Sequence, residues 1–357
     1  MRLYLIGAGV IARTHVAAAA HLGEDVEVHA AEPVAAVRES FAAEIPEATL
    51  YASSEEMLAS PAREDDVVVI ATPPFAHLGP AVAALRSGRH VLCEKPLVLD
   101  GAEAAELLRV SEETGRLLGS CSTRFRGLPH TETVKRAMVS GVLGDVYGVT
   151  FTTRWPRSRA GIEYQPATRW FLDSSRSGGG VLMDLGPYDV STLFDLFDPV
   201  RVEVRDAWMG RAVTGADPAD VVIDVESDVG AALRLTLPDG RTLPVVFGRA
   251  TGTQATEIAH GEIVGTTGAL HWAPFDSEKP VFLRTDDGGE IAESELEPVP
   301  REPLSIFERP LVEFVHALRG RPSRAALGAV AVAEFLVIRA IYEAVASGAP
   351  QIVEVPR

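Results

Sequence analysis

The first 121 residues alternate short apolar segments with amphipathic ones, and this rhythm restricts the possible folds more than any other feature of the sequence. The apolar segments are continuous runs of Val, Ile, Leu and Ala, which is typical of parallel strands covered on both faces. The amphipathic segments have residues at their ends that commonly cap helices. Asp100 and Ser53 are expected N-caps, and Gly88 and Gly115 are expected C′ glycines. The rhythm predicts a doubly wound α/β fold. The predicted strands are Arg2–Ile6, Val26–Ala31, Asp66–Ala71, His90–Cys93 and Leu117–Cys121, and the predicted helices are Ile11–Leu22, Val34–Glu44, Pro80–Ser87 and Ala102–Thr114.

A glycine-containing turn follows the first predicted strand and begins the first predicted helix, with the pattern Gly7-x-Gly9-x-x-Ala12. Gly7 permits the tight turn, Gly9 permits close approach of the backbone to a pyrophosphate, and Ala12 keeps the helix close to the strand. The helix N-terminus, at Val10 and Ile11, supplies backbone N–H groups and a partial positive charge. This context predicts a dinucleotide-binding turn.

The choice of dinucleotide is predicted from Glu32, which ends the second predicted strand 23 positions after Gly9. A carboxylate here accepts hydrogen bonds from ribose hydroxyls and repels a 2′-phosphate. No arginine follows directly in Glu32-Pro33-Val34, so the sequence favours NAD over NADP. The alternative is a solvated glutamate beside an ordinary glycine turn.

Lys95 is one of three lysines in a chain whose basic residues are otherwise arginine, and with Glu94 it directly follows a predicted core strand. Ligands of open α/β sheets bind beyond the carboxyl ends of the strands, so Lys95 is expected to face the cofactor crevice. Pro96 fixes the local backbone and is a candidate for a cis peptide bond. The tripeptide Glu-Lys-Pro recurs at residues 278–280 with no strand before it. The prediction for Lys95 therefore depends on its place directly after a strand and not on the tripeptide. The alternative is a surface lysine.

The predicted strand Asp66–Ala71 ends at the same edge of the sheet as the strand before Lys95. Thr72 and Pro73 follow it directly, and His77 follows soon after. We expect these three residues to contact the cofactor together with the glycine turn, Glu32, Glu94 and Lys95.

Three consecutive glycines, residues 178–180, begin a predicted helix Gly180–Phe197. Glycines permit close approach of a ligand or of another backbone segment. Asp184 and Tyr188 are four positions apart and are expected to share a face, which Ser191 and Asp195 continue. The remaining positions are mostly apolar, which predicts a buried helix whose polar stripe has partners. A tyrosine beside an aspartate and facing a lysine acts as a proton donor or acceptor. The alternative is a tyrosine in a core hydrogen-bond network.

Beyond residue 122 the pattern changes to that of an α+β domain with an open-faced, mostly antiparallel sheet. Since a single core stops growing at roughly 250–300 residues, the 357-residue chain is expected to have two domains. We predict a dinucleotide-binding domain at 1–121 and a substrate-binding and oligomerisation domain at 122–357. The second domain is predicted to contain helices Thr131–Val139, Leu304–Leu318 and Arg324–Ala346, a loop 156–177, strands Val146–Trp155, Val200–Ala207, Val222–Val229, Ala232–Leu237 and Leu243–Arg249, and turns at Pro238–Gly240 and Asp286–Gly289.

The net charge of −17 argues against nucleic acid and anionic membranes as partners. Cys93 and Cys121 lie in apolar stretches without a C-x-x-C pattern, which predicts buried free thiols in a reducing compartment and no metal site. We find no signal-peptide pattern and no apolar run of about 18 residues, so we expect a cytoplasmic protein.

Taken together, these motifs resemble those of the glucose–fructose oxidoreductase/inositol dehydrogenase/MocA (Gfo/Idh/MocA) family, over nearly the whole chain. The residues that carry the resemblance are Gly7-Ala8-Gly9, Ala71–Pro74 with His77, His90–Pro96, Gly178–Gly180 with Asp184, and the closing stretch Ile341–Gly348. The resemblance implies a Rossmann domain followed by an α+β domain whose open sheet is used for homodimer or homotetramer contacts.

The resemblance also implies roles for single residues. Lys95 would polarise the reacting oxygen, and the residue four positions after Asp184 would be the acid–base group. Many members have histidine there, whereas Tyr188 resembles the glucose–fructose oxidoreductase, dihydrodiol dehydrogenase and ketosugar reductase branches. Ser191 stands where many members have aspartate. Further positions expected to reach the substrate pocket are Arg124, Arg169 and Trp170. For either arginine the alternative is an interdomain salt bridge.

The resulting hypothesis is reversible hydride transfer between NAD and a secondary alcohol or ketone of a sugar, polyol or related cyclic compound. Tyr188 would move the hydroxyl proton, Lys95 would stabilise oxyanion charge, and Asp184 would orient the pair. One alternative is an NAD-dependent hydrolase or epimerase that oxidises and then reduces its substrate. Another is a non-catalytic NAD-sensing regulator on the same scaffold.

Overall fold

The computed structural model describes residues 1–156, 166–211 and 221–356, which form two compact units. Unit 1 comprises Met1–Arg124 and Leu304–Phe335, and unit 2 comprises Phe125–Pro303 and Leu336–Arg357. The predicted domains, 1–121 and 122–357, are each continuous in sequence. The prediction therefore does not include the segment Leu304–Phe335, which belongs to unit 1. Each unit is described by itself below.

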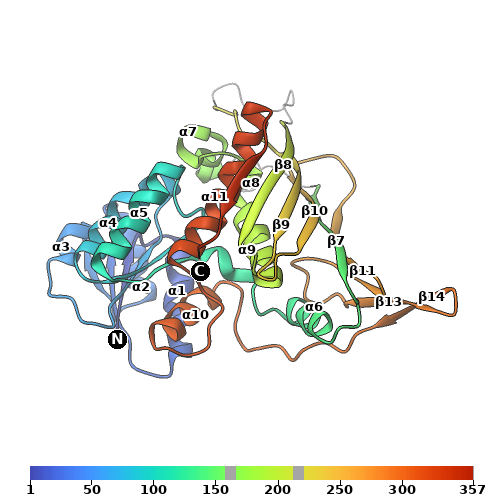
Figure 1. The fold of residues 1–357 in the computed structure, drawn as a ribbon. Helices are drawn as coiled ribbons and strands as arrows, with labels where there is room; N and C mark the ends of the chain where they lie inside the picture. Colours follow the sequence, from blue (N-terminus) through green and yellow to red (C-terminus); the bar gives the residue numbers. More distant parts are fainter. Residues whose placement is uncertain (157–165, 212–220, 357) are drawn as a thin grey trace. The chain divides into compact units, whose positions relative to one another are not determined.

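A seven-stranded sheet forms the centre of unit 1 (Figure 1). Its strand order is β15-β6-β5-β4-β1-β2-β3, in which all pairs are parallel except β15 with β6. The chain leaves β1 toward β2 and later returns to the other side of β1 at β4, which is the topological switch point of a doubly wound fold. The strands are β1 (Arg2–Ile6), β2 (Glu27–Ala31), β3 (Thr49–Tyr51), β4 (Val67–Ile70), β5 (His90–Cys93), β6 (Leu118–Ser120) and β15 (Ala326–Leu327).

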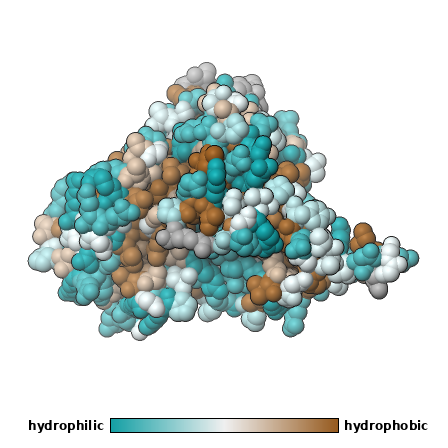
Figure 2. Space-filling model, viewed as in Figure 1, coloured by the Kyte–Doolittle hydropathy of each residue, from teal (hydrophilic) through white to brown (hydrophobic). Residues whose placement is uncertain are grey.

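Four helices of unit 1, namely α1, α2, α4 and α5, lie close to the predicted positions, whereas the bounds of α3 were not predicted and α10 begins five residues after the predicted start at Leu304. Ser53 and Asp100 are N-caps, as predicted, since their side chains accept hydrogen bonds from the backbone N–H groups of Glu56 and Glu103. The outward side of α3, α4 and α5 is mostly hydrophilic (Figure 2), as expected for helices that cover a buried sheet. The helices are α1 (Val10–Ala19), α2 (Ala35–Glu44), α3 (Ser54–Leu58), α4 (Leu78–Arg86), α5 (Gly101–Thr114) and α10 (Arg309–Leu318), with short 3₁₀ turns η1 (Ala20–Leu22), η2 (Pro74–Ala76) and η3 (Cys121–Phe125).

A nine-stranded sheet forms the centre of unit 2, and α8 and α9 lie against one of its faces (Figure 1). Its strand order is β14-β13-β12-β11-β7-β10-β9-β8-β16, and every pair except β7 with β10 is antiparallel. In β10, Leu243, Val245 and Phe247 are buried whereas Val246 is 56% exposed, so the sheet has one open face, as predicted. The strands are β7 (Val146–Trp155), β8 (Arg201–Gly210), β9 (Asp228–Thr236), β10 (Thr242–Thr251), β11 (Ile258–Gly265), β12 (Gly268–Trp272), β13 (Phe282–Asp287), β14 (Glu290–Glu295) and β16 (Gln351–Glu354).

One predicted strand of unit 2 is wrong in its extent. Strands are predicted at Val222–Val229 and Ala232–Leu237, but residues 222–227 form no strand, and one continuous strand, β9, runs from Asp228 through most of the second predicted strand. Gly230 does not break it, because that position lies under the ring of Trp208 in β8, where a side chain would not fit. The turns at Pro238–Gly240 and Asp286–Gly289 are confirmed, since they join the antiparallel pairs β9–β10 and β13–β14.

The remaining helices differ from the prediction in extent or are additional to it: α6 begins two residues before the predicted start at Thr131, and α7 was not predicted. The predicted loop 156–177 contains a 3₁₀ segment, η4 (Pro166–Leu172), and the short helix α7 (Ser174–Ser177), while residues 157–165 lie outside the described ranges. The others are α6 (Pro129–Val139), α8 (Val181–Asp184) and α9 (Gly186–Phe197), and α11 (Gly328–Ser347) contains the boundary between the units. Over the described ranges, no helix is both long and apolar enough to cross a membrane.

Candidate active site

The glycine turn has the geometry that a bound pyrophosphate requires. Gly7 has φ +95°, and a Cβ atom there would lie 2.8 Å from the carbonyl oxygen of Ala71. A Cβ atom on Gly9 would meet nothing within 4 Å, so the backbone is open on that side. α1 begins without a side-chain cap, and Val10 is 84% exposed, which leaves the N–H groups of its first turn for a ligand. The turn therefore fits a dinucleotide.

Glu32 lies directly beside this turn. Its Oε2 accepts a hydrogen bond from the N–H of Ala8 at 3.2 Å, and its Oε1 accepts one from the N–H of Val34 at 3.0 Å. The carboxylate is therefore fixed where the first and second strands end, as predicted for a group that binds ribose. The sequence analysis did not foresee Arg38, whose guanidinium donates to the carbonyl oxygens of Glu32 and Pro33.

We expect Glu32→Ser to reduce the preference for NAD over NADP, measured as the ratio of the two kcat/KM values, by about 10- to 100-fold, because a hydrogen bond to a charged group contributes about 1.5–3 kcal/mol. The ratio should fall because the kcat/KM with NAD decreases. Glu39→Ser, on the exposed side of α2, is the matched control and should leave the ratio unchanged. An unchanged ratio in Glu32→Ser would contradict the assigned role.

The carboxyl ends of β1, β4 and β5 lie at one level of the sheet. Ile6 pairs with Ile70, which in turn pairs with Cys93, so the residues that follow them share an edge. The N–H of Glu94 donates to the carbonyl of Ile70 at 3.0 Å, and Lys95 comes next, half-buried. The position predicted for Lys95 at the ligand-binding edge is thus observed, and the Lys95–Pro96 peptide bond is cis.

His77 holds two of these edge segments together. The ring is fully buried, with Nε2 2.9 Å from the carbonyl oxygen of Thr72 and Nδ1 3.0 Å from that of Pro96. Burial lowers the pKa of His77, so the neutral ring is favoured and donates through one nitrogen at a time. Contacts of His77, Thr72 and Pro73 with the cofactor stay predictions.

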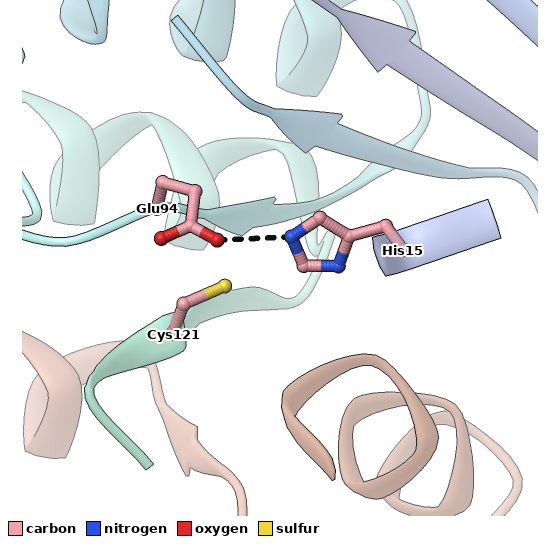
Figure 3. A group of neighbouring side chains, drawn as sticks. All are labelled: His15, Glu94 and Cys121. Carbon is pink, nitrogen blue, oxygen red and sulfur yellow. Dashed lines mark hydrogen bonds and ion pairs between the residues drawn. The ribbon is translucent and has the colours of Figure 1, made fainter. Parts of the chain in front are cut away.

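Glu94 is the centre of a buried polar cluster that the sequence analysis did not find (Figure 3). His15 Nε2 lies 3.0 Å from Glu94 Oε1, and Arg124 Nη2 lies 2.7 Å from both carboxylate oxygens. Burial alone would raise the pKa of Glu94, but the charge of Arg124 and the hydrogen bond from His15 hold it well below its usual range. Glu94 and Arg124 were candidate site residues in the sequence, but no local signal indicated that they pair with each other or with His15.

His15, Glu94 and Cys121 offer three possible metal-ligand atoms within 4.8 Å of one another. The surrounding chemistry does not suit a metal, because the guanidinium of Arg124 already contacts both Glu94 oxygens. Burial, and next the charge of Glu94, raise the pKa of the Cys121 thiol, whereas a metal ligand must be a thiolate. The cluster is therefore a hydrogen-bonded ion pair, and Cys93 and Cys121 are buried free thiols, as predicted.

The predicted helix Gly180–Phe197 is wrong in one respect, because it breaks at Leu185 into α8 and α9. Pro187 has no N–H to donate to the carbonyl of Met183, and its ring disfavours helical backbone before it. Asp184 therefore ends one helix and Tyr188 lies in the first turn of the next, so the i,i+4 argument for a shared face does not hold. The predicted burial is confirmed, since nearly all of α9 is inaccessible to solvent.

The three glycines permit close packing within the protein. A Cβ atom on Gly179 would lie 2.0 Å from the hydroxyl oxygen of Tyr342, and one on Gly180 would lie 1.9 Å from the carbonyl oxygen of Glu226. The Glu226 carboxylate caps α8, since Oε2 accepts from the N–H of Gly180 and Oε1 from that of Leu182 and from the Tyr342 hydroxyl. The glycines thus let the Glu226 segment hold the helix that carries Asp184.

We expect Gly180→Ala to lower the free energy of unfolding by about 3 kcal/mol, because the new methyl group would collide with a backbone carbonyl that cannot rotate away. Urea unfolding of the purified protein measures this. Gly148→Ala in β7, where a Cβ atom would meet nothing within 4 Å, is the control. Equal unfolding midpoints for the two variants would contradict the packing argument.

Tyr188 is 6% exposed and packs edge-on against Phe125, with ring centroids 5.1 Å apart. The next residue, Asp189, is fully buried and forms an ion pair with Arg249 of β10, whose Nε lies 2.7 Å from Oδ2. Burial raises the pKa of Asp189, and the charge of Arg249 opposes this rise. The pair, which the sequence analysis missed, fastens the first turn of α9 to the sheet and so fixes the backbone of Tyr188.

A pocket in unit 2 adjoins Asp184. It contains about 500 Å³ of empty space, partly open to solvent, and apolar side chains such as Phe171 and Val225 form much of its wall. Trp170 stacks on Phe171 with ring centroids 3.9 Å apart, but neither Arg169 nor Trp170 is among the residues that line this pocket. Ser191 is not among the residues that line this pocket. Its hydroxyl oxygen accepts a hydrogen bond from Arg126 Nε at 2.9 Å.

The comparisons with known proteins agree on one family. Residues 1–121 match the model described as "Oxidoreductase family, NAD-binding Rossmann fold", and residues 131–271 match that of the "GFO/IDH/MocA C-terminal domain". The chain is 27% identical over 358 residues to 1,5-anhydro-D-fructose reductase from Ensifer adhaerens, covering 96% of each chain. It is 26% identical over 307 residues to inositol 2-dehydrogenase from Rhizobium meliloti, covering 81% of this chain and 80% of the relative.

A solved structure of levoglucosan dehydrogenase in complex with NADH superposes with a TM-score of 0.76 at 19% identity, covering 100% of this chain and 99% of the other, and shows the same fold. The two family matches together span most of the chain, and the predicted Rossmann fold, α+β domain and NAD cofactor agree with them. The chain belongs to the Gfo/Idh/MocA family of oxidoreductases, with an NAD-binding Rossmann fold in residues 1–121.

Proposed function

We propose that this protein transfers a hydride reversibly between NAD and a secondary alcohol or ketone of a sugar, polyol or related cyclic compound. The observation that carries the proposal is the position of Lys95, which directly follows β5 at the level of the glycine turn. The relatives named as acting on 1,5-anhydro-D-fructose and inositol support a CH–OH group as the reacting group.

Three side chains perform the proton chemistry in this proposal. NAD, when bound, supplies the nicotinamide carbon that accepts or donates the hydride. During oxidation Tyr188 takes the hydroxyl proton as a phenolate, which the ammonium group of Lys95 stabilises together with the negative charge on the reacting oxygen. Asp184 orients the pair. Lys95 belongs to unit 1 and the other two belong to unit 2, so their cooperation is part of the proposal. The proposal also includes a contact of Glu94 with the cofactor and contacts of three further side chains with the substrate, those of Arg124, Arg169 and Trp170.

A spectrophotometric screen tests this function. The purified protein is mixed with NAD or NADP and a panel that includes inositols, aldoses, levoglucosan and, with NADH, 1,5-anhydro-D-fructose and other ketosugars. Net formation or loss of NADH with at least one compound is expected. Conversion of a glycoside or epimer without net NADH would instead identify a redox-cycling hydrolase or epimerase. Tight NAD binding with no turnover of any compound would favour an NAD-sensing regulator.

We also propose a cytoplasmic homodimer or homotetramer that associates through the open face of the nine-stranded sheet. Trp208 and Val246, from neighbouring parts of that face, are 55% and 56% exposed, and exposed apolar side chains on a sheet favour association. Sedimentation of the protein and of a Trp208→Lys/Val246→Lys double variant tests this. A double variant with the same mass as the parent protein would exclude the face as an interface.

A further inference from the structure

The Glu94 carboxylate joins three parts of unit 1 that are distant in sequence, and Figure 3 shows its contact with His15. His15 reaches it from α1, the helix that begins at the glycine turn, and Arg124 reaches it from η3. His15, Glu94 and Arg124 are 0%, 5% and 6% exposed. Because the pKa of Glu94 is held low, the carboxylate is ionised and His15 donates through Nε2. The carboxylate is thus fixed in place from two sides.

The same carboxylate contacts Lys95. The backbone N–H of Lys95 donates to Glu94 Oε2 at 3.2 Å, and the positive charge of the lysine is among the causes that lower the pKa of Glu94. This interaction is reciprocal, because a carboxylate that is stabilised by an ammonium group stabilises that ammonium group equally. The carboxylate therefore holds the backbone of Lys95 and favours the charged form of its side chain.

We propose that His15 and Arg124 are positioning residues for Lys95, acting through Glu94, and that His15 links the lysine to the dinucleotide-binding helix α1. The inference rests on the proposed function, because it assumes that Lys95 is catalytic. Neither His15 nor Arg124 needs to contact substrate for this role. Their function is to hold the charged carboxylate at the position and orientation that Lys95 requires.

A second buried ion pair in unit 1 provides a matched control. Arg2 Nε and Nη2 donate to the two oxygens of Asp66 at 2.9 and 2.6 Å, and the two residues are 8% and 0% exposed. This pair lies where β1 and β4 begin, at the edge opposite to the one where Lys95 follows β5. Arg2→Met should therefore destabilise the protein as Arg124→Met does, without affecting Lys95.

The first readout is the titration of Lys95 itself, which needs neither cofactor nor substrate. The chain has only three lysines, so NMR of isotope-labelled lysine resolves Lys95, with Lys135→Arg and Lys279→Arg for assignment. We expect Glu94→Gln to lower the titration midpoint of Lys95 by about one pH unit, because a neighbouring negative charge is removed. In Arg2→Met the midpoint should equal that of the parent protein.

The second readout is kinetic, with the substrate that the screen identifies. Glu94→Gln and Arg124→Met should each lower kcat by about 10- to 100-fold, and in Arg124→Met the Kd of NAD should change by less than about threefold. Arg124→Lys, which keeps the charge, should recover part of kcat, and His15→Gln, which keeps a donor, should lose less than His15→Phe. Glu94→Gln is nearly isosteric, so it carries the test if Arg124→Met does not fold.

An unchanged Lys95 titration in Glu94→Gln, together with a kcat like that of Arg2→Met, would overturn the positioning role. That result leaves the proposed function standing, provided that Lys95→Met is inactive. Conversely, an active Lys95→Met variant would refute the proposed chemistry even if the titration shifts as expected.

Discussion

Replacing Lys95 by methionine is expected to lower kcat by about 10³-fold or more, while the Kd of NAD stays nearly the same. Methionine keeps much of the length of the lysine side chain but has no charge to stabilise the reacting oxygen, and charge stabilisation together with acid–base catalysis contributes about 10²–10⁴ each in rate. NAD binding depends mainly on the glycine turn and Glu32, which the substitution leaves in place. Steady-state kinetics and NADH fluorescence titration measure the two quantities.

The chain contains its own control for this experiment. Lys279 lies in an identical Glu-Lys-Pro tripeptide, but it is 59% exposed and pairs with Asp276 at the surface. Lys279→Met therefore changes the same tripeptide in the same way at a position away from the strand edge. We expect full activity in this variant. If Lys95→Met retained activity comparable to that of Lys279→Met, the assignment of Lys95 would be refuted.

Asp189→Ala is expected to lower the free energy of unfolding by about 3–5 kcal/mol, because it leaves the guanidinium of Arg249 buried without its partner. Arg249 is 1% exposed and lies between the rings of Trp155 and Phe275, so water does not replace the carboxylate. Guanidinium chloride unfolding measures the change. The exposed pair Arg284–Glu293 is the control, and Glu293→Ala should leave the unfolding midpoint almost unchanged.

A double variant separates the ion pair from the packing around it. Asp189→Leu with Arg249→Met removes both charges and keeps most of the volume, and such replacements are often neutral or stabilising. We expect the double variant to recover most of the stability that Asp189→Ala loses. A double variant as unstable as the single one would show that the site depends on its shape and hydrogen bonds rather than on charge balance.

The parallel sheet could be predicted because its signal is local. Continuous apolar runs such as Val67–Ile70 are read directly from the sequence, and the order of motifs then places the glycine turn and Lys95 at one edge. Pro187 is a local signal for the break at Leu185. The predicted continuous helix Gly180–Phe197 rested instead on the apolar residues around it. Gly230 lies between the two strands predicted in this region, and β9 continues through it because a ring from β8 covers it.

The polar pairs at the centre of each unit could not be predicted. Asp189 and Arg249 are 60 residues apart, and Glu94 is 79 residues from His15. Nothing in the local sequence distinguishes these side chains from solvated ones, because their pairing depends on which elements the tertiary structure brings together. The sequence therefore located the proposed reacting groups, whereas the residues that hold them required the structure.

The core of unit 1 is completed by residues that are synthesised late. Phe314 of α10 packs directly on Gly119 of β6, and Leu311 and Val315 join the same core as Leu3. About 200 residues separate Arg124 from the end of the returning segment at Phe335. At roughly 5–20 residues per second, a ribosome needs about 10–40 s to make them. During that interval the nascent Rossmann sheet exposes the apolar surface that α10 later covers, so this face stays open to water until α10 has been made.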